Sequence, residues 1–161
     1  MIFQKIGKTI GNDLESLSTI ILPRFIGWIQ ELSHRVMAEG ISLNEQQKLV
    51  AASVGVTEVD RIKIFFFDSI QYPDDNLLKE AILENNFLGP DMIGLTVGHG
   101  ILIKKNQLTN RLLSHECRHV HQYERYGSID NFLSEYVKQI VNYGYLYSPL
   151  EVEARSYETS Q

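Results

Sequence analysis

The stretch RLLSHECRHVHQYERYG, residues 111–127, decides the interpretation of the whole fold. Its centre spells H-E-x-x-H with His115, Glu116 and His119. Residues four apart lie on one face of an α-helix, about one turn from each other, so both imidazoles can bind a single Zn²⁺. Glu116 lies about 100° from His115 around such a helix. It can therefore act as a general base without binding the metal, and the spacing predicts a zinc-binding helix.

Three neighbours on this helix are expected to lie outside the ligand set. Cys117 lies about 200° from His115 and is predicted to be a small buried residue. His121 follows His119 by two positions, so it should face away, at the surface or behind the ligands. Gln122 comes seven residues after His115 and returns to the ligand face. It either lines the cleft, contacts the ligands from behind or packs against another helix.

The composition is that of an ordinary soluble globular protein: the 161 residues are 43% apolar and 22% charged, with a net charge of −5. An acidic chain with scattered Lys and Arg lacks the basic surface that nucleic-acid binding requires. Cys117 is the single cysteine, so no intramolecular disulfide can form. The apolar run at 17–29 is interrupted by Pro23 and Arg24 and is too short to span a bilayer. We expect a cytoplasmic protein with neither a nucleic-acid nor a membrane partner, and the sequence leaves its oligomeric state open.

The first 55 residues are predicted to be helical. Apolar residues recur with helical spacing from about 12 to 39, and Pro23 should end or kink this helix. Gly40 is the expected stop. Ser42 and Glu45 fit a capping box, which predicts the start of a short second helix.

Beyond residue 55 the pattern changes to strands and then returns to helices. RIKIFFFDSI (61–70) is predicted to be a largely buried strand, because β-branched and aromatic residues favour sheets, and the triplet at 65–67 belongs to its core. A short helix should begin near Asp74 or Asp75. MIGLTVGHGILIKK (92–105) indicates two strands or one long bent strand. Three helices end the chain, at 107–127, 129–144 and 149–158, with Gly127 and Gly144 as stops.

This order of elements favours an α+β fold with a small mixed or antiparallel sheet. Helices and strands do not alternate along the chain, which argues against a doubly wound parallel sheet. No repeat, low-complexity tract or Pro/Gly-rich linker divides the sequence. We therefore predict one domain, 1–161, with a helical N-terminal part (1–55) and a core (56–161) that carries the H-E-x-x-H helix.

The core resembles a known family in three places: GLTVGHGILI before the motif, LLSHECRHVHQYERYG across it, and GYLYSPLEVEAR after it. These residues are similar to the gluzincin (thermolysin-like) zinc metallopeptidases, especially the compact single-domain members. The resemblance covers roughly 54–158. It implies a zincin-like fold in which a strand borders the cleft, the motif helix supplies two metal ligands and a glutamate on a later helix supplies the third.

The resemblance also implies which glutamate is the third ligand. The family pattern after the motif is E-x-x-A-D, and here it is met by Glu151 and Ala154, while Arg155 replaces the aspartate. In the family that aspartate orients a ligand histidine. An arginine cannot accept a hydrogen bond from imidazole, so either another acceptor holds the histidine or the site is tuned differently. Glu153 is the alternative ligand, because the two glutamates lie about 200° apart on a helix and one zinc ion cannot take both.

The helix that carries Glu151 should begin with Ser148 as its cap and Pro149 at its first position. Its buried stripe is expected to contain Leu150, Ala154 and Tyr157.

Two further sets of residues have alternative interpretations. His99, between two glycines, is either a residue of the cleft rim that contacts substrate or a plain turn histidine. Tyr143, Tyr145 and Tyr147 shortly precede Glu151. One of their hydroxyls could stabilise the oxyanion of a tetrahedral intermediate, or all three could serve packing.

The function expected from these residues is that of a zinc-dependent metallopeptidase. His115, His119 and Glu151 would hold Zn²⁺, and Glu116 would be the general base. The substrate would be a peptide or protein, pairing with the edge of GLTV or GILI by strand addition. The alternative is a catalytically silent zinc-binding or protein-interaction domain on a zincin scaffold. Arg155 favours this alternative, and the intact Glu116 opposes it.

Overall fold

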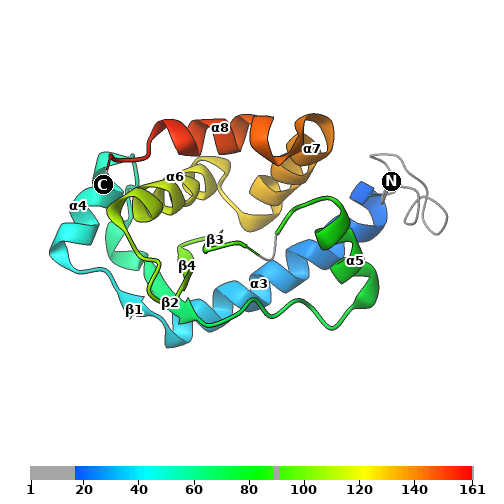
Figure 1. Cartoon of the computed structure of the whole chain (residues 1–161), viewed down its shortest axis with the longest axis horizontal. Coiled ribbons are helices and arrows are strands. Elements are labelled where there is room, and N and C mark those ends of the chain that lie inside the picture. The colour runs from blue at the N-terminus through cyan, green and yellow to red at the C-terminus, as the bar shows by residue number, and fades with distance from the viewer. Residues whose placement is uncertain (1–16, 89–90, 161) are drawn as a thin grey trace.

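The computed structural model describes residues 17–88 and 91–160 (Figure 1). Within them the fold is mixed α and β and mostly helical, with six α-helices and one four-stranded mixed sheet. The α-helices are α3 (Leu22–Glu39), α4 (Glu45–Ser53), α5 (Asn76–Glu84), α6 (Asn110–Tyr126), α7 (Ile129–Tyr147) and α8 (Pro149–Ser156). The strands are β1 (Ile41–Ser42), β2 (Lys63–Phe67), β3 (Gly94–Val97) and β4 (Gly100–Lys104). None of the described helices combines the length and apolarity that a membrane crossing requires.

The sheet has the strand order β1-β2-β4-β3, which leaves β3 at one edge. β2 and β4 are parallel, with Ile64 opposite Ile101, whereas β3 and β4 form an antiparallel hairpin. Of the two alternatives predicted for 92–105, the structure has the two strands and not one long bent strand. Of the two segments considered for strand addition, GILI is the wrong one, because β4 is hydrogen-bonded on both sides.

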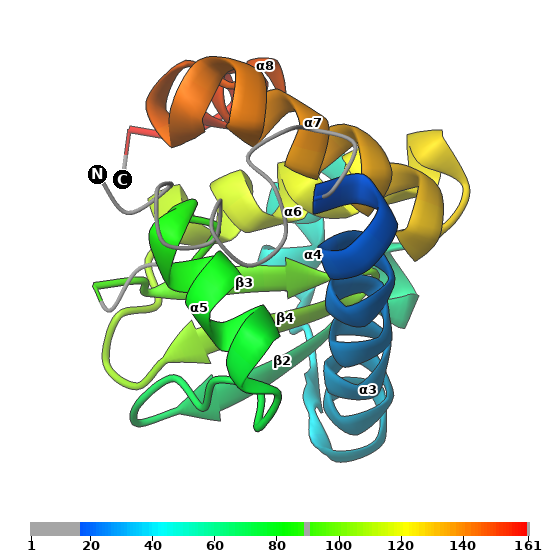
Figure 2. The same ribbon diagram turned by 90° about the vertical axis from the view of Figure 1, so that its right-hand side faces the viewer.

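The two faces of the sheet belong to different apolar clusters. Ile64, Ile101 and Ile103 are buried together with residues of α4 and α6. The alternate residues Phe65 and Leu102 pack against a larger cluster to which α3, α5 and α7 contribute. Strand alternation explains this division, since successive side chains point to opposite faces. In Figure 2, α6 lies over the sheet and α7 and α8 lie beyond it.

Several predicted helix ends are confirmed. A π-helical turn at Leu17–Ile21 changes to α3 next to Pro23, and Gly40 ends α3. The predicted residues 12–16 of this helix lie outside the described part of the chain. Asp75 caps α5, and Gly127 ends α6 with a left-handed φ of 83°, a conformation that glycine adopts without strain.

The capping box was predicted at the wrong residues. Asn44 caps α4 and exchanges hydrogen bonds with Gln47, each 2.9 Å long. Ser42 lies two residues earlier in β1, opposite Lys63 of β2. Strand pairing therefore moves the helix start beyond the serine that local sequence favoured.

The C-terminal helices also differ in part from the predictions. Gly144 has a non-helical backbone, with a φ of 73° and a ψ of 166°, and ends the first helical segment of α7 as predicted; after this kink a second short segment continues to Tyr147. Pro149 begins α8 as predicted, whereas Ser148 precedes it without a capping hydrogen bond from its side chain. Leu150 and Ala154 are buried, but Tyr157 is exposed and lies over the Arg118 guanidinium, 3.7 Å from ring centroid to Cζ.

Candidate metal centre

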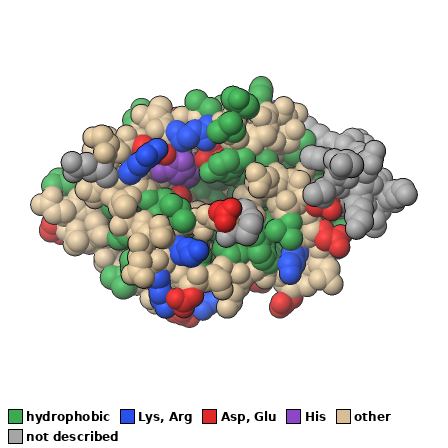
Figure 3. Space-filling model, in the orientation of Figure 1, with side chains coloured by type: hydrophobic (Ala, Val, Ile, Leu, Met, Phe, Trp, Pro, Cys, Tyr) green, Lys and Arg blue, Asp and Glu red, His purple; other side chains and the backbone are tan. Residues whose placement is uncertain are grey.

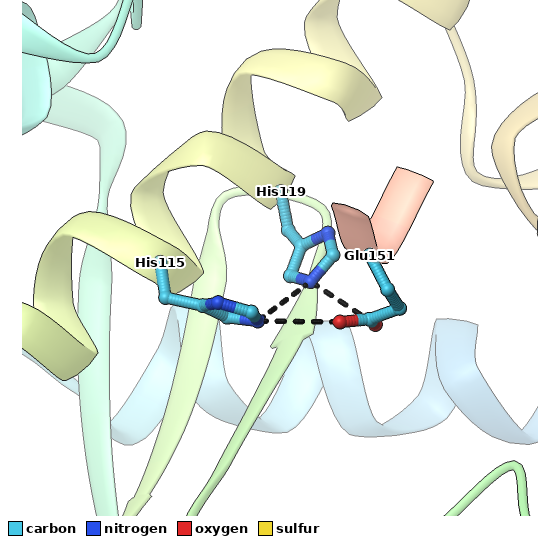
Figure 4. A group of neighbouring side chains, drawn as sticks. All are labelled: His115, His119 and Glu151. Carbon is cyan, nitrogen blue, oxygen red and sulfur yellow. Dashed lines mark hydrogen bonds and ion pairs between the residues drawn. The ribbon is translucent and has the colours of Figure 1, made fainter. Parts of the chain in front are cut away.

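Two helices bring the predicted ligands together. His115 and His119 project from α6, and Glu151 projects from the first turn of α8 (Figure 4). The two histidine Nε2 atoms are 3.2 Å apart. Glu151 Oε2 lies 3.4 Å from His115 Nε2, and Oε1 lies 3.3 Å from His119 Nε2. Glu151 and His119 are buried, and only 12% of the His115 side chain is exposed.

The three side chains fit a metal ion. Tetrahedral ligands at usual zinc–nitrogen and zinc–oxygen distances are about 3.3 Å apart, close to the separations between these atoms. Glu151 Oε2 is buried and accepts no hydrogen bond from any residue that the structure describes. Such an oxygen is costly to bury unless a cation or a donor satisfies it. His115, His119 and Glu151 can therefore hold a metal ion together.

The electrostatics of this cluster favour a positive charge at its centre. Burial lowers the pKa of His119, but the Glu151 carboxylate outweighs burial and raises that pKa to about 9. The same two opposed effects leave the pKa of His115 raised. In turn, burial raises the pKa of Glu151, yet the two histidines hold it well below its usual range. Protons and metal ions therefore compete for the same imidazole nitrogens.

Tyr136 of α7 completes the surroundings of Glu151. Its hydroxyl donates a hydrogen bond of 3.0 Å to Glu151 Oε1. Burial and the charge of Glu151 raise the pKa of Tyr136 well above its ordinary value, so the phenol stays protonated and acts as a donor.

Glu116 is buried beside the cluster and is held by the edge strand. Thr96 Oγ1 of β3 donates a hydrogen bond of 2.7 Å to Glu116 Oε2. Gly94, two residues earlier on the same strand, leaves room for the carboxylate, because a Cβ there would lie 2.6 Å from Glu116 Oε1. The strand and the motif helix are thus fitted together around this carboxylate.

A cavity of about 660 Å³ opens over these residues. His115, Glu116, His119 and Glu151 all line it. The apolar part of its lining comes from several elements and includes Phe25, Ile29, Phe87, Leu88, Phe132 and Leu133. The space-filling view shows histidine at a hollow of the surface, next to acidic, basic and hydrophobic side chains (Figure 3). A mostly apolar cavity with a few converging polar groups is typical of a binding or active site.

Among the three C-terminal tyrosines, Tyr145 is the one that lines the cavity, whereas Tyr143 and Tyr147 do not. Burial at the cavity wall and the charge of Glu151 raise the pKa of Tyr145. Its hydroxyl therefore remains a hydrogen-bond donor at neutral pH.

The residues expected outside the ligand set are not part of the His115, His119 and Glu151 cluster. Cys117 is fully buried, and burial raises the pKa of its thiol. His121 Nδ1 lies 2.8 Å from the Gly55 carbonyl oxygen. His99 lies in the turn between β3 and β4, 3.1 Å from Glu124 and not in the lining of the cavity, which supports its interpretation as a turn histidine.

Glu153 is engaged with arginines rather than with the cluster. Its carboxylate accepts hydrogen bonds from Arg118 at 2.5 Å and from both terminal nitrogens of Arg125 at 2.9 Å. These contacts, those of Arg125 first, lower the pKa of Glu153 to about 2. The structure thus places Glu151, and not Glu153, beside the two histidines.

Three contacts of the site were missed or left open by the sequence. Gln122 touches His119 from behind, with Oε1 2.7 Å from Nδ1, which was one of its three expected roles. Glu158 Oε1 lies 3.0 Å from His115 Nδ1 and was not predicted. The one sequence feature that could have indicated Glu158 is its position seven residues, or two helical turns, after Glu151. The family pattern instead places the histidine acceptor at position 155, which is Arg155 here. No sequence pattern indicated Tyr136.

Comparisons with known proteins give no match: no family model matches the chain, and neither a curated protein nor a solved structure matches it significantly.

Proposed function

We propose that this chain is a zinc-dependent metallopeptidase with a zincin-like core. The observation that carries the proposal is the convergence of His115, His119 and Glu151 beside Glu116 on one cavity wall. Catalytic zinc sites use three protein ligands and leave the fourth position for water or substrate. Two imidazoles and one carboxylate form such a set, which favours zinc over magnesium or calcium, since those ions prefer all-oxygen ligands.

Glu116 is the general base in this proposal. Bound zinc would act as a Lewis acid toward a carbonyl group and lower the pKa of a water molecule. Glu116 would accept a proton from the attacking water and transfer it to the leaving amine. Thr96 holds one carboxylate oxygen of Glu116, and Tyr145 lines the cavity as a protonated donor that can stabilise the oxyanion.

The edge strand supplies a surface for a peptide or protein substrate. β3 carries Gly94 and Thr96 next to Glu116, and among the described residues its only strand partner is β4. An extended peptide can add to such an edge through backbone hydrogen bonds, which would hold it along the wall that carries Glu116.

The test combines metal analysis of the purified protein with cleavage of a broad peptide library. We expect one zinc per chain and hydrolysis. Glu116→Gln keeps the size of the side chain but cannot accept a proton, so it should retain zinc and lose about 10²–10⁴-fold in rate. Glu31→Gln, on the exposed face of α3, is the matched control and should change neither.

The other outcomes are equally informative. Zinc without cleavage of any peptide would favour the alternative, a silent zinc-binding or protein-interaction domain. Full activity of Glu116→Gln would show that another group is the base. A wild-type protein that takes up no zinc would overturn the metal centre itself.

A further inference from the structure

Two side chains lie behind the imidazoles of the cluster, one for each histidine. Gln122 Oε1 is 2.7 Å from His119 Nδ1, and Glu158 Oε1 is 3.0 Å from His115 Nδ1. Both contacts are made to the ring nitrogen that faces away from Glu151. They therefore act on the proton positions of the rings and not on the space between them.

The orientation of the Gln122 amide follows from its other contacts. Its Nε2 lies 3.0 Å from the Leu150 carbonyl oxygen and 2.8 Å from Glu153 Oε2, both of which can only accept. The amide nitrogen must therefore be on that side, and the amide oxygen must face His119. An oxygen there requires a proton on His119 Nδ1. Nε2, which faces Glu151, is then the nitrogen whose lone pair becomes available when a metal ion displaces its proton.

Glu158 has the same effect on His115 by a different chemistry. A carboxylate only accepts hydrogen bonds, so the proton of His115 lies on Nδ1 and its Nε2 lone pair is directed at the cluster. Arg111 Nε donates to the second oxygen of Glu158 at 2.6 Å and fixes the carboxylate. One histidine is thus held by a neutral amide and the other by a charged carboxylate.

We propose that Gln122 and Glu158 are positioning residues that hold His119 and His115 in one tautomer, with both Nε2 atoms ready to bind a metal ion. This inference rests on the proposed metal centre. Partners of this kind, behind metal-binding histidines, contribute about 10–100-fold to metal affinity. Glu158 follows α8, and α8 also carries Leu150 and Glu153, which fix the amide of Gln122 on α6. The segment 150–158 therefore supplies the third ligand, the contact behind His115 and the anchors of the contact behind His119.

The first measurement is zinc affinity, by competition with a chromogenic chelator. Gln122→Met and Glu158→Ala remove the acceptors, and each should weaken zinc binding about 10–100-fold. Glu158→Gln keeps a carbonyl acceptor and should recover most of the loss. Gln139→Met is the matched control, because the Gln139 amide oxygen accepts from the Leu150 backbone N–H at 2.9 Å and anchors α8 without touching an imidazole.

The second measurement distinguishes a specific effect on the histidine tautomers from a general destabilisation of the site. In ¹H–¹⁵N spectra of the zinc-loaded protein, two imidazole Nδ1–H protons should be protected from exchange. Gln122→Met should expose the proton of His119 alone, and Glu158→Ala that of His115 alone. Two results would overturn the positioning roles. One is a loss of zinc affinity in Gln139→Met as large as that in Gln122→Met. The other is unchanged proton exchange and unchanged zinc affinity in both Gln122→Met and Glu158→Ala. Absence of zinc from the wild-type protein would be detected first, and would overturn the metal centre together with this inference.

Discussion

At the residue scale, the two glutamates of α8 differ in the side chains that they contact. Glu151 faces the histidine nitrogens at 3.3 and 3.4 Å, whereas Glu153 is held by Arg118 and Arg125. Each side chain already has an environment suited to one role. A cation would complete the environment of Glu151, whereas the two arginines already complete that of Glu153.

Glu151→Ala should therefore weaken zinc binding by more than the roughly 10–100-fold expected of a contact behind a ligand. Glu153→Ala should cause a smaller loss, because it removes only one of the two acceptors that fix Gln122. Titration of both variants with zinc against a chelator checks the ranking. The reverse ranking would move the third ligand to Glu153.

Position 94 requires glycine, because the Glu116 carboxylate occupies the space that a Cβ would take there. Gly94→Ala should displace the carboxylate and reduce peptide hydrolysis about 10²-fold, the low end for loss of a general base. Zinc content should be unchanged. Gly27→Ala is the control, because a Cβ at this position of α3 meets nothing within 4 Å and alanine favours helix. Equal activity of Gly94→Ala and wild type would contradict the close fit.

At the element scale, the start of α4 shows where a tertiary contact overrides a local signal. Asn44→Ala should destabilise the protein by about 1 kcal/mol, because it removes the cap of α4. Ser42→Ala should cost less, since Ser42 caps no described helix and its hydroxyl accepts a hydrogen bond from the half-buried Lys63 side chain. Urea unfolding of both variants measures the difference. A larger loss of stability in Ser42→Ala than in Asn44→Ala would indicate that Ser42 caps the helix, as the sequence first predicted.

Elements with a local signal were predictable, and those set by distant partners were not. The four-residue spacing of His115 and His119 determines their common helical face, and Gly127 ends that helix by its backbone conformation alone. The pairing of Ser42 with β2 depends on a strand 21 positions later, so local sequence could not show it. Glu158 and Tyr136 reach the site only through the packing of helices. The candidate metal ligands were thus visible in the sequence, while the side chains that contact them from behind were not.

At the scale of the whole molecule, the candidate metal centre joins the motif helix to α8. His115 and His119 come from α6 and Glu151 from α8, so a bound ion would crosslink two elements that pack together. Ligands that bind only the folded protein stabilise it according to their concentration relative to Kd.

Zinc at 1,000 times its Kd should therefore add about 4 kcal/mol, which for a chain of this size raises Tm by about 10 °C. Thermal unfolding with zinc and with a chelator checks this. Glu151→Ala should lose the dependence on zinc, whereas Glu80→Gln, on the exposed side of α5, should keep it. A Tm that does not respond to zinc in the wild type would contradict the crosslink.

Glu124 of α6 connects this helix to two other segments, the 57–58 backbone and the turn that carries His99, and gives stability a dependence on pH. Its carboxylate accepts hydrogen bonds from the backbone N–H groups of Thr57 and Glu58, at 2.9 and 3.0 Å, and lies 3.1 Å from His99 Nε2. Burial raises the pKa of Glu124, but these contacts outweigh burial and lower it below its usual range. A carboxyl group with a lowered folded-state pKa stabilises the protein above its unfolded pKa, and this contribution is lost as pH falls through the folded value.

Glu124→Gln should therefore cost about 1–2 kcal/mol at pH 7, because an amide oxygen cannot replace two charged acceptors. The difference from wild type should shrink below pH 4.5, the ordinary value for this group, and disappear as pH falls through the lower folded-state pKa. Urea unfolding at pH 7, 5 and 3, with a chelator present throughout to exclude effects of metal, measures this difference. Glu80→Gln is the control and should show no such trend. A constant difference between Glu124→Gln and wild type across this pH range would mean that the charge of Glu124 does not hold the three segments together.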